Sequence, residues 1–144
     1  TKMQEHIHHA SVAWEKCIAA TAVHYVNDVL NDIAEYTNGA PASVANFENV
    51  AKHWSELKGF ALSLQFSPTS PFRDEAVTAV DLDDLKMVLS LIGDAPVLAD
   101  GSQNGVPPSG SAEDAVYAYA GKLVKARSIM QDAYGFSDHN TVTW

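Results

Sequence analysis

His53 and Glu56 are the residues of this chain whose types and spacing best suit chemistry. They lie three positions apart within residues 51–60, a stretch that is predicted to be helical. Side chains at positions i and i+3 share a helix face. An imidazole nitrogen and a carboxylate oxygen placed in this way converge on one target, either a metal ion or a hydrogen-bonding partner. Two interpretations therefore stand side by side: a metal-ligating pair and a structural polar pair between helices.

Two weaker groups of candidate ligands lie in the first 32 residues. Glu5 and His8 also stand at i and i+3, and Glu-x-x-His is the element that ferritin-like di-iron bundles use twice. The chain has one copy of it, so adventitious binding of transition metals by the histidines of residues 6–9 is the competing interpretation. His24, Asp28 and Asp32 form an i, i+4, i+8 row, which suits a cation, a solvated helix face or an interhelical hydrogen bond.

Composition limits the classes of partner. The chain has 144 residues, a net charge of −9 and a pI near 4.9. Its few Lys and Arg are scattered, so it would repel a phosphate backbone and we expect no nucleic-acid partner. Charged residues interrupt the longest apolar stretches, so we expect no transmembrane segment. The single cysteine, Cys17, excludes an internal disulfide and is expected to be buried on the first helix.

Hydrophobic periodicity predicts the elements that must position these side chains. Apolar residues recur every three or four positions in four stretches, which predicts helices over residues 2–37, 43–66, 81–92 and 111–134. Asn38-Gly39 and Pro41 are expected to end the first helix, and Ser43, Asp81 and Ser111 to cap the next three. The predicted fold is all-α, an irregular four-helix bundle forming a single domain over residues 1–144.

Parts of the first half resemble a bacterial family of unknown function related to imelysin. The resemblance rests on Trp14-Glu15, on residues 24–27 and above all on the His-Trp-Ser-Glu-Leu-Lys-Gly-Phe run of residues 53–60 followed by Gln65-Phe66-Ser67-Pro68. The imelysin-like signature is Gly-x-His-x-x-Glu. His53 and Glu56 match it, whereas Ala51 stands where the glycine should be.

The resemblance implies an all-helical protein of two bundle-like halves, of which this chain would be one, exported to the periplasm or outer membrane. It also implies an outer-membrane partner in iron uptake, and iron or another divalent or trivalent metal as ligand. The leading hypothesis is therefore a non-enzymatic metal-binding protein with His53 and Glu56 as ligands. A structural or protein-interaction domain is the alternative. A metallopeptidase is the weakest hypothesis, because the sequence offers no set of residues that would activate a nucleophile.

Overall fold

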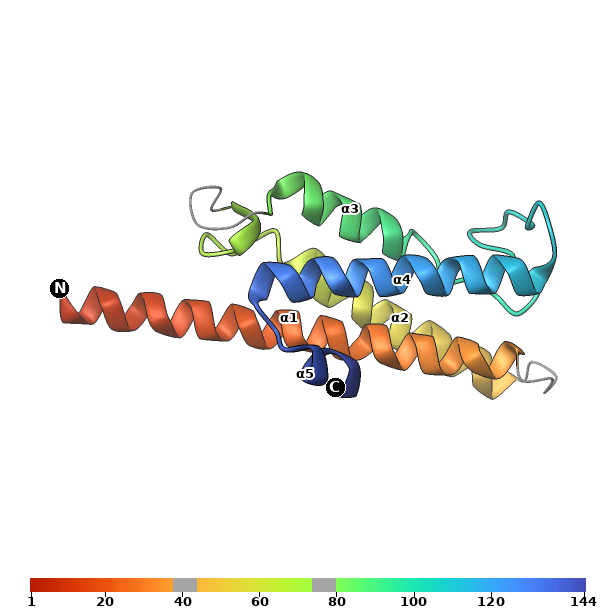
Figure 1. The fold of residues 1–144 in the computed structure, drawn as a ribbon, viewed down its shortest axis with the longest axis horizontal. Helices are drawn as coiled ribbons and strands as arrows, with labels where there is room; N and C mark the ends of the chain where they lie inside the picture. Colours follow the sequence, from red (N-terminus) through yellow and green to blue (C-terminus); the bar gives the residue numbers. More distant parts are fainter. Residues whose placement is uncertain (38–43, 74–79) are drawn as a thin grey trace.

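The computed structural model is all-α and describes residues 1–37, 44–73 and 80–144. Figure 1 shows its helices, which lie side by side as an irregular bundle. In these ranges the α-helices are α1 (Lys2–Thr37), α2 (Val44–Ser63), α3 (Leu82–Ile92), α4 (Ala112–Tyr134) and α5 (Asp138–Thr143), and Pro71–Arg73 forms a 3-10 turn, η1. The predicted all-α bundle is confirmed.

The long helices α1, α2 and α4 form the centre of the bundle. Both α2 and α4 run antiparallel to α1, and α3 lies alongside α4 and also contacts α2 (Figure 1). The side chains that meet between them are fully buried aliphatic residues with a few aromatic ones. Representative members are Val23, Val26 and Val29 of α1, Leu57 and Ala61 of α2, Val88 and Ile92 of α3, and Leu123 and Met130 of α4. The apolar periodicity of each helix is therefore what joins it to the bundle.

Local capping explains where α3 and α4 begin. Asp81 caps α3 in a full capping box, since its side chain accepts from the backbone of Asp83 and Asp84 while the Asp84 carboxylate accepts from the Asp81 backbone. The Ser111 hydroxyl accepts from the backbone of Asp114 at the start of α4. Both caps were predicted. The glycine after α4, Gly135, has φ +63°, the left-handed conformation that ends a helix.

Two helix boundaries differ from the prediction. The helix expected over residues 43–66 is Val44–Ser63, because residues 64–66 close tighter i to i+3 hydrogen bonds ahead of Pro68. The helix α5 was missed, since six residues are too few for a periodicity signal; its cap is Ser137. The expected stop at residues 38–41 and the expected cap Ser43 lie outside the described residues.

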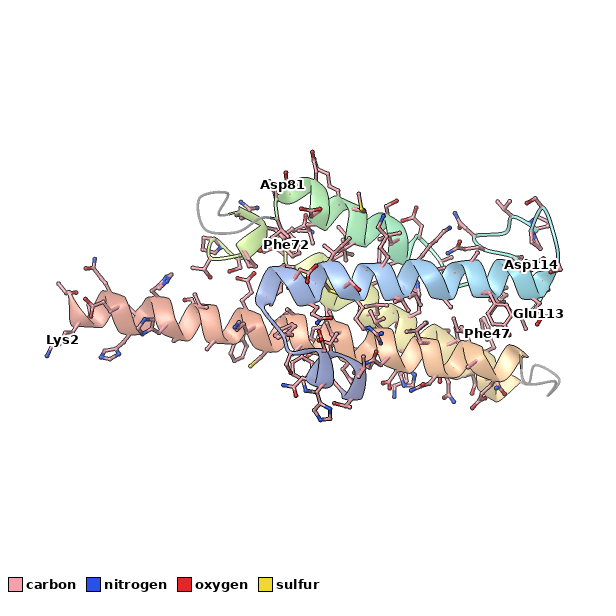
Figure 2. The ribbon with its side chains drawn as sticks, in the orientation of Figure 1. Lys2, Phe47, Phe72, Asp81, Glu113 and Asp114 are labelled. Carbon is pink, nitrogen blue, oxygen red and sulfur yellow. The ribbon has the colours of Figure 1, made fainter. Side chains whose placement is uncertain are left out.

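The first part of α1 projects beyond the bundle as an arm, residues 2–14. Lys2, the first residue of α1, is labelled at its outer end in Figure 2. Met3 is 70% exposed, Ile7 57% and Trp14 73%, and Cys17 is exposed as well. The prediction that Cys17 is buried was therefore wrong, and the apolar residues of the arm are exposed because no other described helix extends far enough to cover them. No helix in the described ranges is long and apolar enough to cross a membrane.

Asn27 holds the C-terminal helix against α1. Its side chain is 93% buried, and its amide nitrogen donates to the carbonyls of Thr141 and Trp144 at 2.9 and 2.8 Å. Its carbonyl accepts from Arg127 of α4 at 2.5 Å. The last carbonyls of a helix have no partner within the helix. One side chain of α1 therefore satisfies the end of α5 and joins it to α4.

Replacing Asn27 with Ala should lower the free energy of unfolding by about 2 kcal/mol, because two carbonyls and a guanidinium lose a buried partner. Urea denaturation followed by circular dichroism measures the change. Asn31→Ala, at an exposed position one turn further along α1, is the matched control and should change it by less than about 0.5 kcal/mol. Equal effects of the two changes would show that the Asn27 contacts do not hold α5.

Candidate functional site

The interface between α1 and α2 brings together two groups of residues that the sequence analysis kept separate. The Nδ1 atom of His53 on α2 lies 2.7 Å from Oδ2 of Asp32 on α1, and both side chains are at most one-fifth exposed. Asp32 belongs to the predicted row of His24, Asp28 and Asp32. The end of that row thus meets His53 across the interface rather than lying in solvent.

Tyr25 is the centre of this arrangement. Its ring stacks on Phe60, with centroids 5.7 Å apart, and lies 5.1 Å from the ring of His24 and 6.1 Å from that of His53. Partial burial, together with the charge and hydrogen bond of Glu56 and the charge of Asp28, raises the pKa of Tyr25. We call His24, Tyr25, Asp28, Asp32, His53 and Glu56 the α1–α2 polar cluster.

Glu56 is the least satisfied member of the cluster. Its Oε2 atom is buried and has no hydrogen-bond partner among the described residues. Burying a carboxylate oxygen without a partner is unfavourable, and most buried polar atoms in proteins have at least one. This oxygen is therefore the atom of the cluster that a bound cation or donor would most stabilise.

The other predicted ligands are less well placed. His24 pairs with Asp28 on its own helix, at 3.2 Å, and its side chain is 47% exposed. Glu5 and His8 are exposed on the arm. His8 precedes His24 by sixteen positions, a separation of roughly 24 Å along a helix, so this pair does not join the cluster. Within the described ranges no three His, Cys, Asp or Glu side chains are arranged to hold a metal ion.

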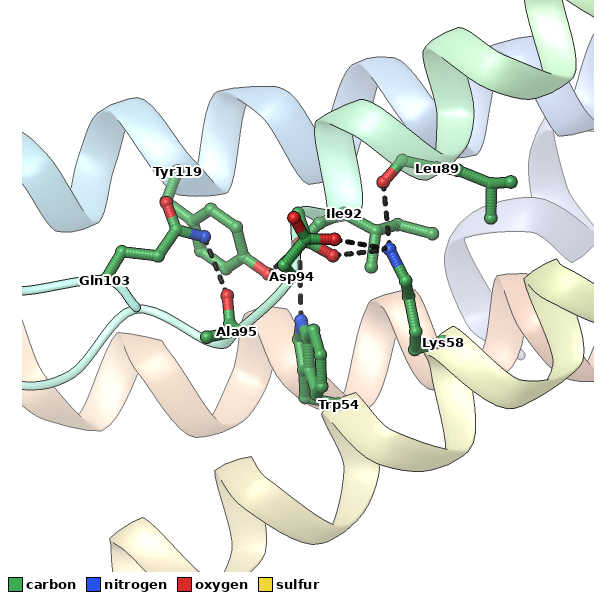
Figure 3. Close-up of polar contacts among 9 residues, drawn as sticks. Trp54, Lys58, Leu89, Ile92, Asp94, Ala95, Gln103 and Tyr119 are labelled. Atoms are coloured by element: carbon green, nitrogen blue, oxygen red, sulfur yellow. Dashed lines mark hydrogen bonds and ion pairs between the residues drawn. The ribbon is translucent and has the colours of Figure 1, made fainter. Parts of the chain in front are cut away.

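Trp54 and Lys58 of the 53–60 run face α3, whereas Ser55 is exposed and donates to the Lys52 carbonyl of its own helix. The Nε1 atom of Trp54 donates to the carbonyl of Ile92 at 3.3 Å. The ammonium group of Lys58 donates to the carbonyls of Leu89 and Gly93 at 3.2 and 2.6 Å (Figure 3). These carbonyls form the C-terminal end of α3, where a cation and added donors are favourable.

A hydrogen bond from α4 and a longer ion pair also lie at the C-terminal end of α3. The hydroxyl of Tyr119 donates to the same Ile92 carbonyl at 2.9 Å (Figure 3), and burial raises the pKa of Tyr119, so the hydroxyl remains a donor. Asp94, which is exposed, lies 3.6 Å from Lys58. Sequence reasoning missed the roles of Lys58 and Tyr119, and the i, i+4 spacing of Trp54 and Lys58 was the available signal.

Comparison with known proteins adds no relative. No family model, no curated protein and no solved structure matches the chain. The imelysin-like resemblance therefore rests on sequence motifs alone, namely Trp14-Glu15 and residues 24–27, 53–60 and 65–68.

Glu56→Gln should not lower the stability of the metal-free protein, and we expect the free energy of unfolding to rise by up to about 1 kcal/mol. The neutral amide has nearly the same shape and removes the negative charge from the buried Oε2 position, which has no hydrogen-bond partner among the described residues. Thermal and urea denaturation in the presence of a chelator measure the change, with Glu48→Gln at an exposed position of α2 as the matched control. A loss greater than about 1 kcal/mol would show that the Glu56 carboxylate has a structural partner.

Proposed function

We propose that this chain is a non-enzymatic helical binding domain that holds a metal ion or metal complex at the α1–α2 polar cluster, with His53 and Glu56 as ligands. The observation that carries the proposal is the buried Oε2 atom of Glu56, which has no hydrogen-bond partner in the described residues and lies one helical turn from His53. A cation beside this oxygen would supply the missing interaction.

The contact between His53 and Asp32 prepares the imidazole for such a role. Metal-bound histidines commonly donate one ring N–H to a carboxylate, which fixes the ring and raises the basicity of the other nitrogen. With Nδ1 of His53 at 2.7 Å from Asp32, the proton belongs on Nδ1 and the lone pair on Nε2. Asp32 is then a positioning residue rather than a ligand.

The small number of protein ligands favours a metal complex over a bare ion. One imidazole and one carboxylate leave most coordination positions to water or to donors that the bound complex brings with it. Imidazole and carboxylate ligands suit iron and zinc alike. Iron is the metal that the resemblance to the imelysin-related family implies, together with export and a place in iron uptake at the periplasm or outer membrane. We extend the proposal to that setting on the resemblance alone.

The competing account is that His53 and Glu56 only join α1 to α2. It is a specific alternative, because Trp54 and Lys58 of the same run do join α2 to α3. It predicts no metal affinity and a loss of stability when both side chains are changed.

Titration calorimetry of metal-stripped protein with Fe(II), Fe(III) citrate and Zn(II) tests the proposal. The double variant His53→Ala with Glu56→Gln should weaken one-to-one binding at least tenfold, and Asp32→Asn should weaken it by about 10- to 100-fold, the usual effect of losing the partner of a ligating histidine. The matched control changes His6, His8 and His9 on the arm to Ala and should leave this binding intact.

Two outcomes would contradict the metal site. Binding that is lost in the arm variant and kept in the His53 and Glu56 variant would assign the metal to the arm histidines. No binding by the unmodified protein, with reduced stability of the double variant, would leave the structural role as the account of this pair.

A further inference from the structure

A cleft lies where the arm of α1 leaves the bundle. It has a volume of about 410 Å³ and is formed by one face of α1 and by the turn that follows α2. Trp14, Ile18 and Pro68 supply apolar walls, and among the described residues Glu15 is the one ionisable group that lines it. The cleft shares no lining residue with the α1–α2 polar cluster, so it is a separate feature of the molecule.

Glu15 is a buried carboxylate without a cation. Glu15 as a whole is 97% buried. The hydroxyl of Tyr134 donates to its Oε1 at 2.7 Å, and the hydroxyl of Thr69 donates to its Oε2 at 3.3 Å. Both donors are uncharged, and none of the ion pairs of the described residues includes Glu15. Carboxylates this deeply buried are almost always paired with a positive group.

The packing of Tyr134 holds the Glu15 carboxylate in place through their hydrogen bond. Burial and the hydrogen bond to Glu15 raise the pKa of Tyr134, so its hydroxyl is protonated and donates at neutral pH. The ring of Tyr134 packs edge-on against fully buried Phe72 and stacks on Phe136. A rigid aromatic group therefore fixes one oxygen of Glu15, while the longer bond from Thr69 leaves the other less firmly held.

Trp14 adds the second half of a cation site. It is 73% exposed, neighbours Glu15 in the chain and lines the same cleft. An indole is the aromatic ring that attracts ammonium groups most strongly. The indole and the buried carboxylate therefore line one cleft, where a single cation could reach both.

We propose that this cleft binds an organic ammonium group carried on a short apolar chain, of the kind found in a lysine side chain or a free alkylamine. The Glu15 carboxylate pairs with the ammonium, the Trp14 indole contacts it, and Ile18 and Pro68 contact the methylene chain. The net charge of −9 raises the local concentration of such cations.

Nuclear magnetic resonance of the tryptophan indole N–H groups tests the proposal on the intact chain. The probes are butylammonium, as a free amine, and the methylamide of Nα-acetyl-lysine, as a lysine side chain. Their neutral counterparts are butan-1-ol and the same lysine derivative acetylated on Nε. Both cations should shift the Trp14 resonance saturably, while the neutral compounds should not. The cation that binds with the higher affinity shows whether the cleft prefers a free amine or a lysine side chain of a protein.

Ligand-observed measurements on three variants identify the residues responsible. Trp14→Ala and Glu15→Gln should each weaken binding of the cations at least about fivefold, as expected when a cation–π contact or a charge pair is lost. Phe66→Ala is the matched control, since Phe66 is an equally exposed aromatic residue outside the cleft lining, and it should change nothing.

Three results would overturn the proposal: no saturable binding of either cation, equal binding of the neutral compounds, or equal weakening by Phe66→Ala. If Glu15→Gln destabilises the fold, Trp14→Ala still decides the matter, because its exposed side chain can be removed without opening the core.

Discussion

The C-terminal end of α3 is the point where three helices meet through hydrogen bonds. Trp54 and Lys58 of α2 and Tyr119 of α4 all donate to the carbonyls of residues 89–93. The Leu89 carbonyl also accepts from the backbone of Gly93 at 3.1 Å, whereas the carbonyls of Ile92 and Gly93 have no partner within α3, and leaving them unsatisfied in a partly buried position would cost free energy. The ammonium of Lys58 also meets the negative end of the α3 dipole. The short helix α3 thus owes its place to side chains of other helices as well as to its apolar face.

This constraint explains why the 53–60 run is so dense in polar and aromatic residues. Trp54 and Lys58, one turn apart, face α3, while His53, Glu56 and Phe60 face α1. The helix α2 therefore uses two adjacent faces for two different neighbours. On the face toward α3, the polar groups of Trp54 and Lys58 all donate hydrogen bonds to α3 carbonyls. On the face toward α1, the Oε2 atom of Glu56 is buried and has no hydrogen-bond partner among the described residues. We therefore assign a structural role to the α3 face and a candidate binding role to the α1 face.

Much of the fold could be predicted from the sequence, because its helices are amphipathic and several have clear caps. Asp81 and Ser111 cap α3 and α4 as predicted. The exposure of Met3, Ile7 and Trp14 could not be foreseen, since a periodic stripe shows that a face is apolar and not whether a partner covers it. The sequence also identified His53, Glu56 and the row ending at Asp32, but their meeting depends on the register of α1 against α2, which local spacing does not determine.

Lys58→Met is the most direct test of the central claim that the 53–60 run holds α3 in place. Lys86→Met is the matched control, because Lys86 is 75% exposed and pairs with an equally exposed Asp83. We expect Lys58→Met to lower the free energy of unfolding in urea by about 2 kcal/mol, the scale of a charged hydrogen-bond donor lost from a partly buried site, and Lys86→Met to change it by less than about 0.5 kcal/mol. Equal, small changes in both variants would contradict the claim.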